Sequence, residues 1–377
     1  MRAELITSIE GIAPIEDEWR ELAVSAGSAF TSPEWVRAWH DAAPRELLMV
    51  AAVRHEDGSL AGVMPMTADG PGRRGTLRFA GAALGDHFGP VAAPDDQGEV
   101  AAAAMRAIQA ADGAPGMAIL HRVDAGAEWP ARMAAESRRR LSVIEQSPAD
   151  LLYIPTAGLD WDGYLATRSQ KFRQRVARGL EKALAKEHEF GVRECADPAE
   201  LDADLASLLR LHDMRHAEGS SISPGRDRQF LAEFARMALE RGWLRLRLLE
   251  IDGEPAPVAA FLAWRIGPRY AIYQSGFDPA WASNSVGALL LVQTVRAGIE
   301  EGAEEVDMLL GEEAYKQRFA AATRTVHTVT LVPAGAPRRL LAAAEAAARR
   351  RARGLANTPY VGAALKRAAR LLPTGRR

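Results

Sequence analysis

The sequence has a single cysteine, Cys195, among 377 residues, and only 6% of its residues are aromatic. One thiol allows no disulfide within the chain and excludes a cysteine-rich zinc module. Nothing near Cys195 in the sequence resembles an activating group, so we expect an inert thiol. No apolar run approaches the roughly 20 residues of a membrane-spanning helix, and the first residues lack a secretory signal pattern. These absences predict a soluble, cytoplasmic protein.

Charge is distributed unevenly along the chain. The net charge is −2, but eleven Lys and Arg and one acid, Glu345, lie from Arg338 onward, so the preceding residues carry a net −12. An acidic body is a poor general nucleic-acid binder, and we expect no nucleic-acid partner. Residues 336–377 are predicted to form a basic amphipathic helical tail. This tail could pack on the body, contact an anionic membrane surface or another polyanion, or bind nucleic acid.

Two parts of the chain show the same order of predicted elements. In each, helices precede two strands joined by a Gly-containing turn, Glu56–Ser59 or Asp252–Pro255, and a β–α–β segment follows. The first part ends at a strand near Leu151–Pro155, and the second closes with Thr325–Val332. The order predicts an α/β (α+β) protein with mixed sheets flanked by helices. We expect domains at residues 1–155 and 156–335, followed by the tail.

The strand Arg269–Phe277 leads into small residues where a helix begins at Gly287. Open backbone N–H groups at such a helix start suit a phosphate or pyrophosphate, although Ser and Asn there also serve as helix caps. The candidate phosphate-binding residues are Ser283, Asn284, Ser285 and Gly287. Tyr273 and Gln274 lie on the preceding strand and are candidates for substrate binding.

A second candidate group surrounds the strand Glu305–Leu310. Asp307 lies in this strand, Gly311 ends it, and a predicted helix with Glu312, Tyr315 and Lys316 follows. A lysine near a strand end can direct its charge toward a developing oxyanion or a donor phosphate. Because a charged lysine accepts no proton, Lys316 is the candidate donor, and His212 or Glu312 the candidate proton acceptor.

Basic residues recur every three or four positions along Arg168–Lys186, which is predicted to be one helix. The stripe is either a solvated face or a site for an anionic ligand, with Arg173 and Arg175 expected to point inward. His212 and His216 lie one turn apart, but no third ligand is evident, and we expect no metal. Arg215 and His216 are candidates for substrate binding, and an acceptor could bind near Asp86 and His87.

Several segments together resemble the CelD/BcsL-type acetyltransferases, which are relatives of the FemAB aminoacyltransferases within the GNAT-like superfamily. The matching segments span most of the chain and follow one another in the family's order. They are Phe30–Trp35, the basic helix with Phe172 and Arg173, Leu211–His216, Asp252–Pro255, Tyr273–Pro279 and Gly311–Phe319.

The resemblance implies tandem GNAT-like domains with acyl transfer in the second. It places the family's aromatic–lysine pair on Tyr315 and Lys316, and the superfamily's pyrophosphate loop on Ser283–Gly287, although the usual Arg/Gln-x-x-Gly-x-Gly/Ala pattern is absent there. The expected function is N-acyl transfer from acetyl-CoA or another acyl-CoA to a small-molecule or glycan amine, such as an amino sugar. Two alternatives are an aminoacyl- or peptidyl-type transferase with another donor, and a non-catalytic scaffold in exopolysaccharide synthesis. Through the tail the protein could lie peripherally at the inner membrane.

Overall fold

The structure is a computed structural model and describes residues 1–137, 141–215, 222–311 and 316–333. The predicted tail therefore lies outside the described residues, as do His216, Glu312 and Tyr315. No helix within the described ranges is long and apolar enough to cross a membrane. We call residues 1–155 the first half and residues 156–333 the second half.

The first half contains seven strands and four α-helices among its described residues. In chain order these are β1 (Arg2–Ile6), α1 (Glu16–Ser25), α2 (Pro33–Ala42), β2 (Leu47–Arg54), β3 (Leu60–Ala68), β4 (Thr76–Phe79), β5 (Val91–Ala92), α3 (Gln97–Ala110), β6 (Met117–Asp124), α4 (Trp129–Ala135) and β7 (Leu141–Pro155).

The second half begins with a broken helical segment. Its elements are α5 (Trp161–Ala166), α6 (Gln170–Phe172), the π-helix η4 (Arg173–Ala177), α7 (Gly179–Leu184), β8 (Phe190–Glu194), α8 (Leu201–Arg215), α9 (Arg226–Glu240), β9 (Leu244–Ile251), β10 (Ala259–Ile266), β11 (Arg269–Phe277), the 3₁₀ helix η5 (Pro279–Asn284), α10 (Val286–Glu300), β12 (Glu305–Leu310), α11 (Lys316–Phe319) and β13 (Ala322–Pro333).

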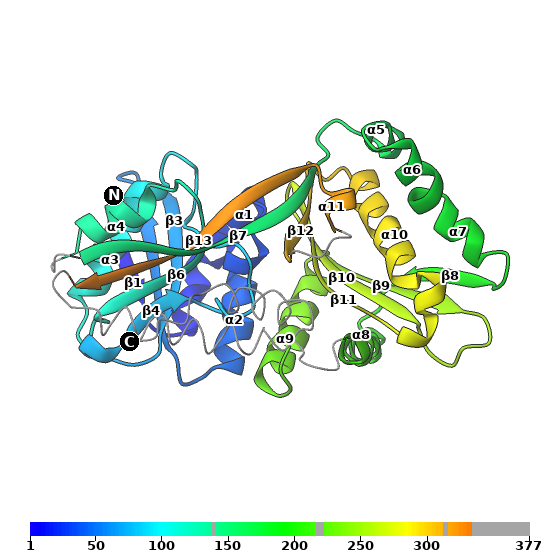
Figure 1. Cartoon of the computed structure of the whole chain (residues 1–377). Helices are drawn as coiled ribbons and strands as arrows, with labels where there is room; N and C mark the ends of the chain where they lie inside the picture. The colour runs from blue at the N-terminus through cyan, green and yellow to red at the C-terminus, as the bar shows by residue number, and fades with distance from the viewer. Residues whose placement is uncertain (138–140, 216–221, 312–315, 334–377) are drawn as a thin grey trace, which may run out of the picture.

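One mixed sheet runs through both halves. Its strand order is β1-β2-β3-β4-β6-β13-β7-β12-β11-β10-β9-β8, with β5 paired to β3. The last strand of each half pairs with the other half: β7 lies against β12, and β13 lies against β6. β7 and β13 also pair with each other and cross side by side between the two lobes (Figure 1). The halves have therefore exchanged their final strands.

The strand order is symmetric about the β13–β7 pair. On the first side, β4, α3 and β6 form a β–α–β unit with parallel strands, and on the second side β11, α10 and β12 do the same. The predicted mixed sheet flanked by helices is confirmed. The repeated order of elements seen in the sequence corresponds to this repeated connectivity.

In the second half, helices cover both faces of the sheet. Leu289, Val295 and other apolar residues of α10 pack on one face, together with Tyr164 and Phe172 from the α5–α6 region. Helices α8 and α9 lie on the opposite face, where Leu208 and Phe234 join a core that continues into the first half (Figure 1). The two faces thus have different neighbours: the core around α8 and α9 continues through the first half, whereas the core around α10 reaches it at Ile154 of β7.

An aromatic cluster joins the halves. The Trp35 ring of α2 lies edge-on to Phe230 and Phe234 of α9, at centroid distances of 4.6 and 5.0 Å. The Ser32 hydroxyl caps α2 by accepting a hydrogen bond from the Trp35 backbone N–H. The buried Glu34 carboxylate forms ion pairs with Arg20 and with Arg241 of the second half. The segment Phe30–Trp35 therefore builds the contact between the halves.

Two predicted elements differ from the structure. The single helix expected over Arg168–Lys186 is broken into α6, η4 and α7, because Ser169 caps a new start at α6 and five residues form a π-helix. A side chain at Gly179 would lie 2.7 Å from the Gln174 carbonyl oxygen, so glycine allows the irregular path there. The strand expected near Leu151–Pro155 begins at Leu141, since its first part pairs with the distant β13.

Candidate active site

Strands β11 and β12 are parallel but pair over only three residues. Arg269–Ala271 pair with Glu305–Asp307, after which no pairing between the two strands continues. Strand β11 runs on to Phe277 beside β10, whereas β12 turns to β7 through a bulge. The carboxyl ends of the two strands therefore diverge. Such an opening in a parallel pair is a common place for a ligand in α/β proteins.

Helix α10 begins at the carboxyl end of β11. Ser285 precedes it with φ +56° and makes no side-chain cap. Among the described residues, the backbone N–H groups of Val286, Gly287 and Ala288 have no acceptor. A side chain at Gly287 would approach the Phe277 ring to 3.1 Å, so glycine keeps the helix start close to the strand end. Open N–H groups and the positive end of the helix dipole are features that suit an anion.

The end of β12 is held in an unusual conformation. Leu309 has φ +56° although it is a bulky residue, and its N–H donates to Asp307 Oδ1 at 2.8 Å. Asp307 is fully buried, and burial raises the pKa of its carboxyl group against the opposing effects of Arg269, the Leu309 N–H and Arg324. Lys316 Nζ donates to the Leu310 carbonyl oxygen at 2.6 Å. The lysine thus lies at the carboxyl end of β12.

Helix α8 touches β11 at Gly276. A side chain there would come within 2.2 Å of the His212 backbone nitrogen, so only glycine allows this approach. His212 Nδ1 lies 3.1 Å from the Ser275 carbonyl oxygen, and Arg215 donates to the Ser275 hydroxyl at 2.6 Å. A carbonyl only accepts, so Nδ1 carries the imidazole proton and Nε2 is the basic nitrogen. Burial lowers the pKa of His212, which favours the neutral form.

The Gly-rich loop of residues 81–90 reaches from the first half to this region. The Tyr273 hydroxyl donates to the Leu84 carbonyl oxygen at 2.9 Å, and burial raises the pKa of that phenol well above its ordinary value. Asp86 accepts a hydrogen bond from the Leu310 N–H at 3.3 Å and pairs with Arg122. Asp86 therefore binds the end of β12 directly, as a structural link between the halves.

The corresponding opening in the first half is filled. Strands β4 and β6 pair at only two positions, but the Phe88 N–H then donates to the Arg122 carbonyl of β6 at 3.1 Å. The buried Phe88 ring stacks on Phe79 at a centroid distance of 5.2 Å. The first half thus closes its own opening with the loop that contacts the second half.

The structure brings most of the described candidate residues to one region around β11, β12 and the start of α10. Gln274 is half-buried on β11, between Tyr273 and Ser275. Arg173 and Arg175 belong elsewhere, on η4. Arg173 donates to the Leu165 and Arg168 carbonyl oxygens. Arg175 is exposed, so the expectation that it points inward is wrong, because η4 turns its apolar side chains toward the core instead.

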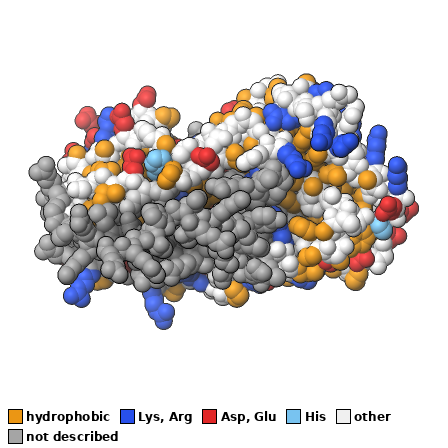
Figure 2. Space-filling model, in the orientation of Figure 1, with side chains coloured by type: hydrophobic (Ala, Val, Ile, Leu, Met, Phe, Trp, Pro, Cys, Tyr) orange, Lys and Arg blue, Asp and Glu red, His pale blue; other side chains and the backbone are white. Residues whose placement is uncertain are grey.

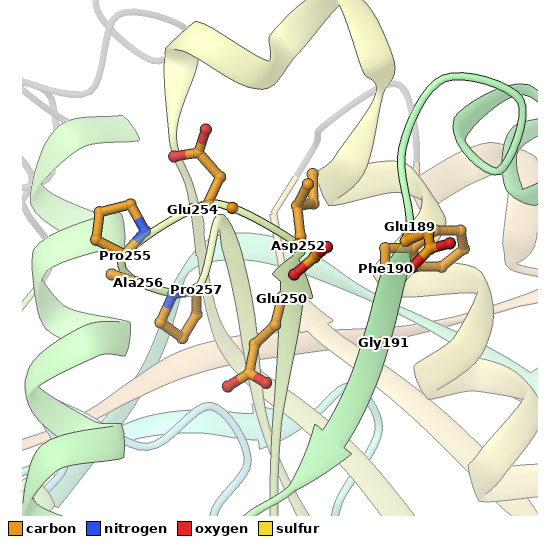
Figure 3. A pocket seen from close by; sticks show the side chains of 11 residues that line it. Glu189, Phe190, Gly191, Glu250, Asp252, Glu254, Pro255, Ala256 and Pro257 are labelled. Carbon is orange, nitrogen blue, oxygen red and sulfur yellow. The ribbon is translucent and has the colours of Figure 1, made fainter.

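A separate hollow of about 510 Å³ lies at the far edge of the sheet (Figure 3). Its lining comes from the start of β8 and the turn between β9 and β10, away from the divergence of β11 and β12. The hollow is acidic, and Glu250 and Glu254 point in opposite directions within it. Such a lining does not suit phosphate. No group of three or more His, Cys, Asp or Glu that could hold a metal occurs in the described part of the chain.

The sequence reasoning missed Gly276, Ser275 and the link made by Asp86 to β12. Gly276 stood within the segment matched to the family, but its closeness to α8 depends on packing between elements. Cys195 is buried, and burial, with Asp204 adding to it, raises the pKa of its thiol to about 12. The thiol is therefore protonated at neutral pH.

Several solved structures have a fold similar to that of this chain. FemX is 12% identical and superposes with a TM-score of 0.64 over 90% of this chain and 99% of its own. A conserved protein of unknown function from Bacteroides thetaiotaomicron is 11% identical, with a TM-score of 0.54 over 87% and 99%. L-PGS from Bacillus licheniformis is 12% identical, with a TM-score of 0.50 over 88% and 97%. These likenesses concern the fold.

No curated protein matched the sequence. Residues 170–317 match the family model described as an acetyltransferase (GNAT) domain. The match runs from α6 to the first residues of α11 and contains the divergence of β11 and β12 and the start of α10. The second half is therefore similar, over residues 170–317, to a GNAT acetyltransferase domain.

Proposed function

We propose that the protein is an N-acyltransferase that uses an acyl-CoA, with acetyl-CoA the first candidate, and an amine acceptor. The observation that carries the proposal is the divergence of β11 and β12 beside the three open N–H groups of α10. A phosphate-bearing thioester donor would have its phosphates at the start of α10 and its acyl group between the diverging strands. Ser283, Asn284, Ser285 and Gly287 would form the phosphate-binding segment.

Acyl transfer requires a neutral amine and a donor to the carbonyl oxygen as negative charge develops on it. Lys316 would hold its ammonium toward that oxygen or a donor phosphate, with Tyr315 beside it. His212 fits the role of proton acceptor, because burial keeps its imidazole neutral and Nδ1 is oriented by the Ser275 carbonyl. Glu312 is the alternative acceptor in this proposal.

The acceptor would approach from the side of the sheet covered by α8, where Arg215 and Ser275 provide polar groups beside the Phe277 ring. We propose Tyr273, Gln274, Asp307, Arg215 and His216 as the residues around it. The resemblance to the CelD/BcsL-type acetyltransferases favours an amino sugar or a related component of polysaccharide synthesis. A cytoplasmic location, with the basic tail at the inner membrane surface, completes this proposal.

The test is a thiol-release assay with acetyl-CoA and a panel of amino sugars and small amines. Lys316→Ala should lower turnover about a hundredfold or more, the usual loss for one oxyanion donor. The matched control, Lys186→Ala, removes an exposed lysine that follows the end of α7 and should change turnover less than twofold. Melting temperatures of both variants separate loss of chemistry from loss of fold.

Equal effects of the two lysine variants would show that the assigned site is wrong. Absence of acyl-CoA binding by the wild-type protein, with binding of an aminoacyl donor instead, would favour the alternative transferase. Binding of neither donor would favour a scaffold.

A further inference from the structure

A row of cationic side chains follows the broken helical segment α6–η4–α7. We call Lys171, Arg175, Arg178, Lys182 and Lys186 the basic row; all five side chains are exposed, and they recur every three or four residues. Blue Lys and Arg atoms gather over this segment in the space-filling view (Figure 2). The π-helix η4 lies in the middle of the row and has no buried residue.

The basic row has no acidic partners. Most arginines elsewhere in the second half are paired, as Arg193 is with Asp204 and Arg228 with Asp213. No ion pair or hydrogen bond of the described chain involves a side chain of the basic row. The one acid within residues 168–186, Glu181, lies 3.4 Å from the Gln293 amide nitrogen of α10. Five unneutralised charges are therefore held together on one side of an otherwise acidic body.

The row lies on the solvent side of a segment that borders the proposed donor site, since α7 contacts η5 and both η4 and α7 contact α10. Val176, Leu180 and Leu184 of the same segment pack into the core with α10, and the basic row lies on the other side of the segment, toward solvent. All five cations are exposed to solvent, and they are spread over residues 171–186. The row therefore fits an extended anionic surface better than the phosphates of one small ligand.

Two extended polyanions come into consideration, nucleic acid and an anionic bilayer. Single-stranded nucleic acid binds proteins through basic grooves combined with exposed aromatic rings on which bases stack. The exposed large apolar side chains in the described part of the chain are Leu47, Val143 and Met214, none of them aromatic. Clusters of four to eight Lys and Arg on an amphipathic helix, with the apolar side already packed, suit the headgroups of anionic lipids.

We propose that the basic row binds the surface of an anionic lipid bilayer. The binding is electrostatic, because the apolar side of the segment is packed on α10 and leaves nothing to insert. Each cation near such a surface strengthens binding about fivefold, and the effect falls off over a Debye length of about 8 Å at physiological salt. The row would place the start of α10 and the divergence of β11 and β12 near the membrane.

The test uses the full chain and cosedimentation with vesicles of phosphatidylcholine containing 30% phosphatidylglycerol, against pure phosphatidylcholine vesicles. The variant Arg178→Glu/Lys182→Glu should bind the anionic vesicles at least about 25-fold more weakly, from two cations at about fivefold each. The matched control Arg45→Glu/Arg132→Glu makes the same change in net charge at exposed residues of the first half and should bind within about threefold of wild type.

A third variant, Arg349→Glu/Arg351→Glu, changes the tail. Loss of vesicle binding in the tail variant with unchanged binding in the Arg178/Lys182 variant would overturn the proposal, as would tighter, row-dependent binding of single-stranded RNA than of vesicles. Row-dependent binding of acetyl-CoA would also overturn it, because the row would then belong to the donor site. This inference stands apart from the proposed function: row-dependent vesicle binding without acyl-CoA binding would support it while the acyltransferase proposal fails.

Discussion

Single residues at the contact between β11 and α8 control how closely these elements approach. A Cβ added at Gly276 would collide with the backbone of His212. Neither backbone can move aside without separating α8 from the sheet. By contrast, Gly191 in β8 has no atom within 4 Å of the position of an added Cβ. The two glycines allow the role of close packing to be separated from the general effect of glycine in a strand.

Gly276→Ala should lower the free energy of unfolding by about 3 kcal/mol or more, since an atom forced into a filled space displaces the backbone. Gly191→Ala should be neutral or stabilise by about 0.5–1 kcal/mol, because alanine loses less chain entropy than glycine in a strand. Denaturant unfolding of both variants measures the difference. Similar free energies for the two would contradict the packing described at Gly276.

His212 gives a pH dependence whose sign follows from its burial. Burial lowers the pKa of His212 in the folded state, whereas the unfolded chain takes up a proton near the ordinary value of about 6.5. The unfolded state then binds more protons, so His212 makes stability fall as pH drops below about 6.5. Between pH 7.5 and 5.5, the melting temperature of the wild-type protein should decrease more than that of the His212→Gln variant. Parallel curves for the two proteins would argue against a buried, neutral imidazole.

At the scale of elements, the equivalent helices α3 and α10 differ in what lies before them. Both have glycine at their second position, Gly98 and Gly287, and each helix lies in the chain between the two parallel strands of its β–α–β unit. The opening beside β4 is filled by Phe88. At the start of α10, by contrast, no acceptor among the described residues binds the N–H groups of Val286, Gly287 and Ala288. The two positions form a matched pair for testing where an anion binds.

Gly287→Asp should weaken acetyl-CoA binding at least about tenfold, because its carboxylate would compete with a phosphate for the open N–H groups of α10. Gly98→Asp, at the same position of α3, should leave acetyl-CoA binding unchanged. Isothermal titration calorimetry measures both. An acid in the first turn of a helix is favourable, whereas an added Cβ at Gly287 would lie 3.1 Å from the Phe277 ring. The melting temperatures of both variants are therefore measured beside their affinities. Equal affinities of the two variants would remove the start of α10 from the donor site.

The loop of residues 81–90 is the second element that can be tested. Asp86→Ala would leave the Leu310 N–H without its acceptor and remove the carboxylate partner of Arg122, which should cost about 1–3 kcal/mol of unfolding free energy. Hydrogen exchange at the end of β12 should become faster. Asp95→Ala, at an exposed position, is the control and should change neither quantity. Unchanged exchange in Asp86→Ala would show that the loop does not hold β12.

Much of the element order could be predicted from the sequence, and the reasons are local. Both hairpins were found because a Gly-containing turn separates two apolar runs, and β11 and β12 were predicted with the bounds they have. The break of the basic segment at η4 was missed, because its three-to-four residue spacing is that of a continuous helix. The pairing of β12 with β7 could not be predicted either, because it is set by the fold of the whole chain.

The candidate site also combines features that have a local sequence signal with features that depend on the whole fold. Ser283–Gly287 could be proposed from small residues before a helix, and Lys316 from its place after a strand. The roles of Asp86 and Ser275 depend on contacts between elements separated by 60 residues or more in the sequence. No local pattern reports such contacts.

At the scale of the whole molecule, the exchange of final strands makes each half depend on the other. The sheet of the first half includes β13, and the second half needs β7 beside β12. We expect residues 1–155 and 156–377, produced separately, each to fail to fold cooperatively, because each lacks a strand in the middle of its sheet. The two fragments produced together should assemble into a complex with the circular dichroism spectrum of the intact chain.

Size-exclusion chromatography and amide exchange of the single fragments measure this dependence. A stably folded fragment 156–377, with protected β9–β12, would contradict it and would show that the second half is independent. Calorimetry of the intact protein should likewise give one unfolding transition. Two well-separated transitions would show that the halves unfold independently.

The position of β13 also has a consequence for synthesis on the ribosome. Strand β6 leaves the ribosome roughly 200 residues before β13, the strand that pairs with it, and at 5–20 residues per second the wait is on the order of 10–40 s. During that time β6 and the first part of β7 present unpaired edges, which are templates for association with other chains. A nascent chain of this protein is therefore expected to depend on chaperones until its last strand is inserted, and slower translation of the second half should increase aggregation rather than relieve it.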